Sequence, residues 1–358
     1  MRVGLANLPL HYGAAPSWLF DRMKKLSREI VLAMLEEFGQ EEVLRRLADP
    51  YWFQSFGCLL GFDWHSSGVT TTVCGALKEG LRGLEKDTGI FIVGGKGRTS
   101  RKAPEEIIRY GDKYGIAQTE RLIYLSKMSA KIDNSALQDG FSLYHHTFIF
   151  TSKGEWVTIQ QGMNLNIRMA RRYHWLSDRI VSLVNEPHTA ICCDQKTTTL
   201  NLVAEKSKKT REIATKLVQD NFQELTKNLR KIKEKKLNLP AHHPIYSFDF
   251  NQKKLEERLV KIKEKIPQNF EELLAIEGVG PKTVRALALI AEVIYGAKPS
   301  YEDPVRYSFA HGGKDGYPYP VNKRQYDQSI NILSKAIRRA KIGQRERINL
   351  LKKLAFSS

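Results

Sequence analysis

Residues 269–296 constrain the fold most, because their sequence predicts two short helices joined by a glycine turn (NFEELLAIEGVGPKTVRALALIAEVIYG). Asn269 can cap the first helix, and Glu272 follows it at the capping-box spacing. Gly278 and Gly280 lack a Cβ atom, so the turn can take positive φ angles and approach a ligand closely. The chain is therefore expected to contain a helical hairpin with an accessible backbone turn.

The start of the second helix is a candidate phosphate site. Pro281 fits the first helical position, where backbone N–H groups can bind an anion. The stretch resembles the helix-hairpin-helix motif of DNA repair and recombination proteins, and this resemblance implies contact with the DNA backbone and not with the bases. The residues predicted to contact DNA are Gly278, Val279, Gly280, Lys282, Thr283 and Arg285.

The charge of the chain also favours a nucleic-acid partner. Among the 358 residues, Lys plus Arg outnumber Asp plus Glu by 57 to 39, which gives a formal net charge of +18. A protein of a membrane surface would have a similar charge, but the predicted hairpin favours DNA. The Lys- and Glu-rich composition is also consistent with a thermophilic source.

The cellular location of the protein and the state of its cysteines are predicted from motifs that the sequence lacks. It contains no apolar run of about twenty residues and no signal peptide, so a cytoplasmic protein without a membrane partner is expected. Its four cysteines include no C-x-x-C pair, which argues against a disulfide framework, a structural zinc site or an iron–sulfur cluster.

The pattern of apolar residues predicts an α+β N-terminal domain followed by a mainly α-helical C-terminal domain that contains the helix-hairpin-helix. Helices are expected in residues 17–39 and 41–61, a strand in residues 89–95, and a β-hairpin around Lys153 and Gly154. The predicted divisions are residues 1–203 for the α+β domain, 204–250 for a charged helix and linker, and 251–358 for the helical domain.

Reactive side chains are concentrated between residues 131 and 161. Asp133 and Asp139 could bind a divalent cation, Mg²⁺ or Mn²⁺, with His145 as a third ligand. His146 could equally be the ligand or a general base, because neighbouring residues of a strand point to opposite faces. The alternative is a packed histidine and two aspartates that cap turns. The cluster comprises Lys131, Asp133, Asn134, Gln138, Asp139, His145, His146, Gln160 and Gln161, with Lys131 near the phosphate.

Two other segments carry candidate chemistry. GFDWHSSG places Asp63 and His65, two candidate catalytic residues, in a turn that enters a helix, and the start of that helix could hold an anion. GGKGRTSRK, residues 94–102, is a basic glycine loop after a strand. It lacks the G-x-x-x-x-G-K-[ST] order of a P-loop, so a phosphate-contacting loop is predicted and ATP hydrolysis is not. His11 is a further candidate.

Several segments together resemble the uncharacterised family called domain of unknown function 763. They include LPLHYGAAPSWLFDRM, FGCLLGFDWHSSGVTTTVCGALKEGL, KMSAKIDNSALQDGFSLYHHTFIF, ARRYHWLS and FAHGGKDGYPYPV, and the resemblance covers nearly the whole chain. This family implies no particular reaction. The candidate residues above are therefore assigned from the chemistry of their side chains and not from the family.

The hairpin also resembles that of DNA glycosylases with lyase activity. In those enzymes the Lys that follows the turn forms a Schiff base, and Lys282 matches this position. An Asp beyond the second helix assists, and Asp303 is a displaced match. The chain leaves little room for the helical domain that builds their base pocket, so Lys282 is predicted to contact a phosphate.

Together, these features predict a metal-dependent deoxyribonuclease for structures such as bubbles or forks. The hairpin would hold the DNA backbone, and the N-terminal domain would cleave it. A DNA-binding repair scaffold without activity is the first alternative, and a glycosylase or AP lyase is the second. A homo-oligomer is compatible with each prediction.

Overall fold

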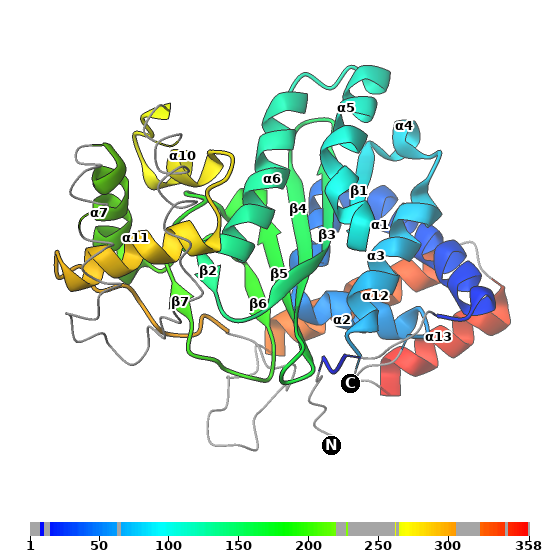
Figure 1. Ribbon diagram of the computed structural model, residues 1–358. Coiled ribbons are helices and arrows are strands. Elements are labelled where there is room, and N and C mark those ends of the chain that lie inside the picture. Colours follow the sequence, from blue (N-terminus) through cyan, green and yellow to red (C-terminus); the bar gives the residue numbers. More distant parts are fainter. Residues whose placement is uncertain are drawn as a thin grey trace.

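The computed structural model describes residues 8–10, 15–62, 66–219, 227, 262, 265–305, 323–340 and 343–356. They form mixed α and β structure around a five-stranded antiparallel sheet in the order β1-β3-β4-β5-β6, with a smaller antiparallel pair of β2 and β7 (Figure 1). The strands are β1 (Ile90–Lys96), β2 (Leu137–Gln138), β3 (Ser142–Thr151), β4 (Trp156–Asn164), β5 (Met169–Leu176), β6 (Ala190–Cys192) and β7 (Leu200–Asn201).

The large sheet is buried on both faces. In β1, Phe91 and Val93 belong to one apolar cluster, whereas Ile90 and Ile92 belong to another. Successive side chains of a strand point to opposite faces, so the apolar run of β1 supplies both clusters. A slip of one residue in the pairing would exchange the two sets of side chains, which fixes the register strongly.

On one face of the sheet, α5 (Ala103–Tyr114) and α6 (Thr119–Ser135) pack against the strands (Figure 1). The same apolar cluster continues beyond α6 into α7 (Lys208–Gln219), α10 (Phe270–Ala275) and α11 (Pro281–Val293), which pack against α6 and one another. On the other face, α1 (Ser17–Ala48) and α3 (Gly68–Leu81) contact the strands, and α2 (Pro50–Leu59), α12 (Lys323–Arg339) and α13 (Gln344–Phe356) pack against these helices and one another. The short helix α4 (Glu85–Thr88) precedes β1, and the 3-10 helices are η1 (Gly97–Lys102), η2 (Ser177–Arg179) and η3 (Glu205–Ser207).

Helix α6 carries an apolar and a polar buried stripe. The apolar residues recur every three or four positions and are Leu122, Leu125, Met128 and Ile132. The polar residues have the same spacing and are Ser126, Ser129 and Asp133. This spacing places both stripes on the side of α6 that packs against the sheet.

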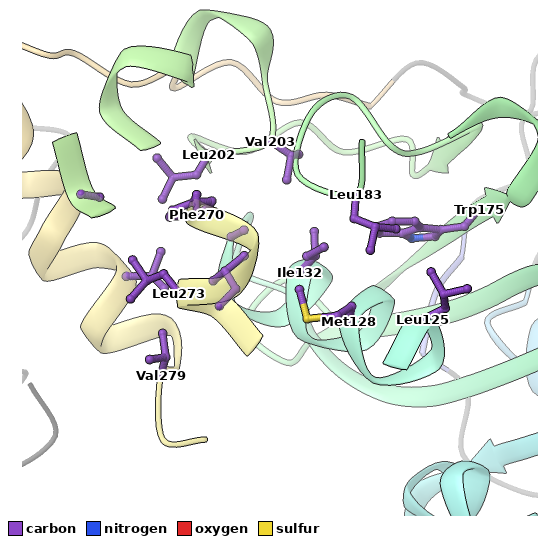
Figure 2. Close-up of a cluster of buried hydrophobic side chains, with 14 of the residues drawn as sticks. Leu125, Met128, Ile132, Trp175, Leu183, Leu202, Val203, Phe270, Leu273 and Val279 are labelled. Atoms are coloured by element: carbon purple, nitrogen blue, oxygen red, sulfur yellow. The ribbon is translucent and has the colours of Figure 1, made fainter. Parts of the chain in front are cut away.

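The α10–α11 hairpin shares its core with α6. Figure 2 shows Phe270, Leu273 and Val279 of the hairpin beside Met128 and Ile132 of α6. These side chains belong to one cluster, so the core crosses the boundaries predicted near residues 203 and 250. Helix α12 likewise packs against α1 in the second cluster, where an ion pair also links Arg339 to Glu37.

The structure confirms several elements that the sequence predicts. Strand β1 occupies the apolar run, and β3 and β4 pair around the turn at Lys153 and Gly154. The first predicted helix ends as expected at Gly39, whose φ of 79° and ψ of 177° are not helical and divide α1 into two helical segments. The second predicted helix is divided in turn, because α1 ends at Ala48 and α2 begins at Pro50. Asp49 then caps α2 by accepting hydrogen bonds from the N–H groups of Tyr51 and Trp52 at 2.9 and 3.0 Å.

Two other predictions have a more limited outcome. The charged helix predicted after residue 204 is described only as α7, and the predicted linker at residues 241–250 lies outside the described residues. Of the helices in the described ranges, none has the length and apolar character needed to cross a membrane.

Candidate functional site

The α10–α11 hairpin has an exposed backbone turn. Asn269 caps α10, because its side chain accepts a hydrogen bond from the N–H of Glu272 at 2.9 Å. Gly278 has a φ of 86°, which favours glycine, while the side chain of Val279 is buried beneath the turn. Gly280 precedes α11 without a capping side chain, and a Cβ atom at Gly280 would meet no atom of the described residues within 4 Å.

Side chains from α6 and β2 hold this turn in place. Lys131 donates a hydrogen bond from Nζ to the carbonyl oxygen of Ile276 at 2.7 Å. Gln138 donates to the carbonyl oxygen of Pro281 at 2.9 Å and accepts from Nε of Arg285 at 2.7 Å. Lys131 and Arg285, both predicted to contact phosphate, therefore make contacts that fix the hairpin. Burial lowers the pKa of Lys131.

The remaining predicted DNA contacts differ in exposure. Lys282 and Gly278 are exposed, whereas Thr283 is fully buried. Oγ1 of Thr283 has no hydrogen-bond partner among the described residues. Among the side chains predicted to contact DNA, that of Lys282 is exposed on the surface of the hairpin.

Asp133 is fully buried and accepts three side-chain hydrogen bonds. Its Oδ2 accepts from Gln160 Nε2 at 2.5 Å and from Trp175 Nε1 at 3.0 Å. Its Oδ1 lies 2.5 Å from Nε2 of His188, which comes from the segment between β5 and β6. Because both oxygens are engaged, this carboxylate holds α6, β4 and β5 together.

Asp139 is part of a different buried network, centred on Arg171. Nη1 of Arg171 donates to Asp139 at 2.9 Å, and Nη2 donates to Asp303 at 2.8 Å. The hydroxyl of Tyr173 also donates to Asp139, at 2.7 Å. Although burial opposes its charge, the two carboxylates and Tyr173 keep the pKa of Arg171 above its ordinary value. Asp303, the displaced match to a lyase aspartate, is thus bound to Arg171 and to the N–H of Thr197.

His145 and His146 face opposite sides of the sheet. Nε2 of His146 lies 2.8 Å from Oγ of Ser126 on α6, and its Nδ1 lies 2.9 Å from Oε1 of Gln160. Nε2 of His145 lies 2.9 Å from Oγ1 of Thr147. His146 is therefore the histidine connected to Asp133, through Gln160. Burial lowers the pKa of both imidazoles, that of His145 to about 3, and keeps them neutral.

The predicted metal ligands do not gather in one place. Asp133 and Asp139 belong to the two separate networks, and His145 lies on the other side of the sheet. No group of three His, Cys, Asp or Glu side chains suited to a metal ion is found in the part of the chain that the structure describes. Asp63, His65 and His11 lie outside that part.

The basic glycine loop is a strand end followed by η1. Gly94 has a φ of 81°, and a Cβ atom there would lie 2.2 Å from the carbonyl oxygen of His146, so β1 and β3 require glycine at this point. The four basic residues that follow Gly94 in this loop are exposed to solvent. They are Lys96, Arg98, Arg101 and Lys102.

A pocket of about 710 Å³ brings the hairpin, η1, α6 and β3 together, and we call it the hairpin pocket. Ala275 and Glu277 contribute the hairpin side, and Ser100 and Arg101 contribute η1. The α6 and β3 residues that line it include Tyr124, Ser126, Lys127, Lys131, Tyr144, His145 and His146. Lys131 and His146, both predicted as catalytic, thus line the same pocket, whereas the imidazole of His145, another lining residue, points to the opposite face of the sheet.

The residues that complete these networks were not among the predicted site residues. Ser126 is seven residues before Asp133, a helical spacing that indicates a shared face of α6. Arg171 and Trp175 alternate along β5 with the period of a strand, which indicates one face of the sheet. No sequence signal links His188 to Asp133, because a loop brings them together.

Comparisons with known proteins identify the family alone. Neither a curated protein nor a solved structure matches the chain. A family model described as "Protein of unknown function (DUF763)" matches residues 4–321, which is most of the chain. The protein therefore belongs to the DUF763 family.

Proposed function

We propose that the protein is a deoxyribonuclease that holds DNA by the α10–α11 hairpin and cleaves a backbone phosphodiester in the hairpin pocket. The observation that supports this most is that the hairpin turn and the basic η1 line one pocket, whose wall carries Ser126 and His146. A strand held by the turn would pass directly over these side chains. In this proposal the α10–α11 turn acts as a helix-hairpin-helix and binds the DNA backbone.

The charges around the pocket suit a polyanion. Arg101, Lys127 and Lys131 line it together with a single carboxylate, Glu277. The exposed cations of η1 extend this positive surface away from the hairpin. Such a surface attracts DNA regardless of its sequence, and its affinity for DNA should fall steeply with salt concentration.

Backbone N–H groups at the start of α11 would bind the phosphate. Gly280 has extended backbone angles, and a Cβ atom there would meet no atom of the residues that the structure describes within 4 Å. Gly280→Ala should therefore fold normally while a methyl group obstructs the approach of the phosphate. We expect DNA affinity to fall roughly tenfold, the effect of losing one charge-assisted hydrogen bond.

Gly296→Ala, at the other end of α11, is the matched control for this variant. A Cβ atom at Gly296 also meets no atom of the described residues within 4 Å, but the φ of 66° strains an alanine and should cost about 1 kcal/mol of stability. Gel-shift titrations and urea unfolding of both variants measure the two effects separately. Unchanged DNA affinity in Gly280→Ala would argue against this phosphate site.

Cleavage is tested on duplex, single-stranded, forked and bubble DNA in Mg²⁺, Mn²⁺ or EDTA. The requirement for a metal and the preference for bubbles or forks rest on the sequence alone. We expect His146→Asn to abolish cleavage and retain binding, because the hairpin is unchanged. Binding without cleavage in every condition would instead favour the repair scaffold, and borohydride trapping of abasic DNA through Lys282 would favour the lyase.

A further inference from the structure

The contact between Ser126 and His146 has the geometry of an activated serine. Oγ of Ser126 lies 2.8 Å from Nε2 of His146, and both side chains line the hairpin pocket. A serine hydroxyl becomes a nucleophile when an adjacent base accepts its proton. Whether His146 can do so depends on which of its nitrogens carries the hydrogen.

Gln160 determines that tautomer. Its Nε2 donates to two acceptors, Oδ2 of Asp133 at 2.5 Å and the carbonyl oxygen of Ser129 at 3.2 Å. The amide orientation is therefore fixed, and Oε1 of Gln160 faces Nδ1 of His146 at 2.9 Å. Since Oε1 can only accept, Nδ1 carries the hydrogen. Nε2 of His146 is then an acceptor, and the hydroxyl of Ser126 donates to it.

Ser129 shows what an ordinary serine does on the same face of α6. Its hydroxyl donates to the carbonyl oxygen of Ser126, three residues earlier in the helix, at 3.1 Å. Such local hydrogen bonds are usual for a helical serine. The hydroxyl of Ser126 instead reaches across to β3. Ser129 is equally buried and does not line the hairpin pocket, which makes it a matched control.

We propose that Ser126 is a nucleophile that attacks a phosphodiester of DNA bound in the hairpin pocket, with His146 as its base. This inference rests on the proposed function. The Ser126 proton passes to Nε2 of His146 as the bond from Oγ to phosphorus forms. The bond from phosphorus to one sugar oxygen breaks on the opposite side, and that oxygen takes a proton from water. The hydroxide left by that water then attacks phosphorus, the bond from phosphorus to Oγ breaks, and Oγ of Ser126 takes its proton back from Nε2 of His146.

The residues around the pocket fit this chemistry. Lys127 and Arg101 lie on its wall, where they would offset the negative charge of the phosphodiester. Burial lowers the pKa of His146 and so weakens it as a base, whereas the hydrogen bond to Gln160 and the charge of Asp133 act in the opposite direction. Gln160 orients the imidazole, and Asp133 holds Gln160.

The test is covalent labelling of the full-length protein with a fluorophosphonate. Ser126 would form a bond to phosphorus, fluoride would leave, and the serine proton would pass through His146 to solvent. Mass spectrometry of the intact protein and its peptides locates the adduct. We expect labelling of the wild type and of Ser129→Ala, none of Ser126→Ala, and labelling about a hundredfold slower in His146→Asn. Near-ultraviolet circular dichroism checks that each variant is folded.

The outcomes distinguish this inference from the proposed function. Excess bubble DNA should slow labelling of the wild type at least tenfold, while Ser126→Ala should bind the same DNA with unchanged affinity in gel shifts. No label on the folded wild type, or a label that persists in Ser126→Ala, overturns the nucleophile. DNA that binds without slowing the labelling overturns the phosphodiester as its substrate. DNA that binds to no variant overturns the proposed function itself and, with it, DNA as the substrate of Ser126.

Discussion

Replacing Arg171 with leucine is expected to destabilise the protein by about 3–5 kcal/mol, because it leaves two buried carboxylates without their cation. Arg171 is fully buried, and its partners Asp139 and Asp303 are 1% and 3% exposed. Water cannot replace the lost hydrogen bonds at this depth. Urea unfolding followed by circular dichroism measures the change in the free energy of unfolding.

The exposed ion pair of Arg45 and Asp178 is the control for the buried one, because its nitrogen–oxygen distance is the same. Its Nε and Oδ2 atoms lie 2.8 Å apart, as close as those of Arg171 and Asp303, but its side chains are 47% and 38% exposed. Solvent screens such a pair, so Arg45→Leu should cost about 1 kcal/mol or less. Equal costs for the two leucine variants would contradict the structural role of Arg171. A combined Arg171→Leu, Asp139→Asn and Asp303→Asn variant should recover part of the loss, since no buried charge remains.

Acid is expected to destabilise the protein progressively below about pH 6.5, because buried histidines stay neutral in the folded state. Burial lowers the pKa of His145 to about 3, and it also lowers that of His146 and of His174. Between the unfolded value near 6.5 and the folded value, the unfolded chain binds more protons. Stability is therefore complete above pH 6.5 and falls as the pH falls toward 3.

The size of this effect is testable at His145. Each pH unit below 6.5 costs about 1.4 kcal/mol for one histidine, so His145 alone should cost roughly 3 kcal/mol at pH 4. Burial raises the pKa of Asp139, and that carboxyl offsets part of the loss in acid. Urea unfolding at pH 7, 5.5 and 4 should show a smaller pH dependence for His145→Asn than for the wild type. Identical slopes would show that His145 does not contribute.

Local sequence patterns predicted the elements that local interactions determine. The cap at Asn269 and the turn at Lys153 and Gly154 each depend on a few neighbouring residues. Their dihedral preferences and hydrogen bonds act within one turn or one hairpin. Such features can be read from a single sequence.

The candidate site was harder to predict, because its contacts join distant parts of the chain. Asp133 and Asp139 are six residues apart in sequence, yet their partners belong to two separate networks. Lys131 has the positive charge expected near a phosphate, but its Nζ donates to the carbonyl oxygen of Ile276, which is 145 residues away in the sequence. Whether Lys131 contacts a phosphate or fixes the hairpin depends on how α10 and α11 pack on α6.

The packing of α12 and α13 against α1 sets the order in which the chain can mature on the ribosome. Residues 323–356 complete a cluster that begins at residues 17–48, and about 300 residues must be synthesised between them. At about 5–20 residues per second, this interval lasts roughly 15–60 s. The apolar stripe of α1 that α12 covers stays open to water throughout, so the nascent chain is most prone to aggregate just before its last two helices emerge.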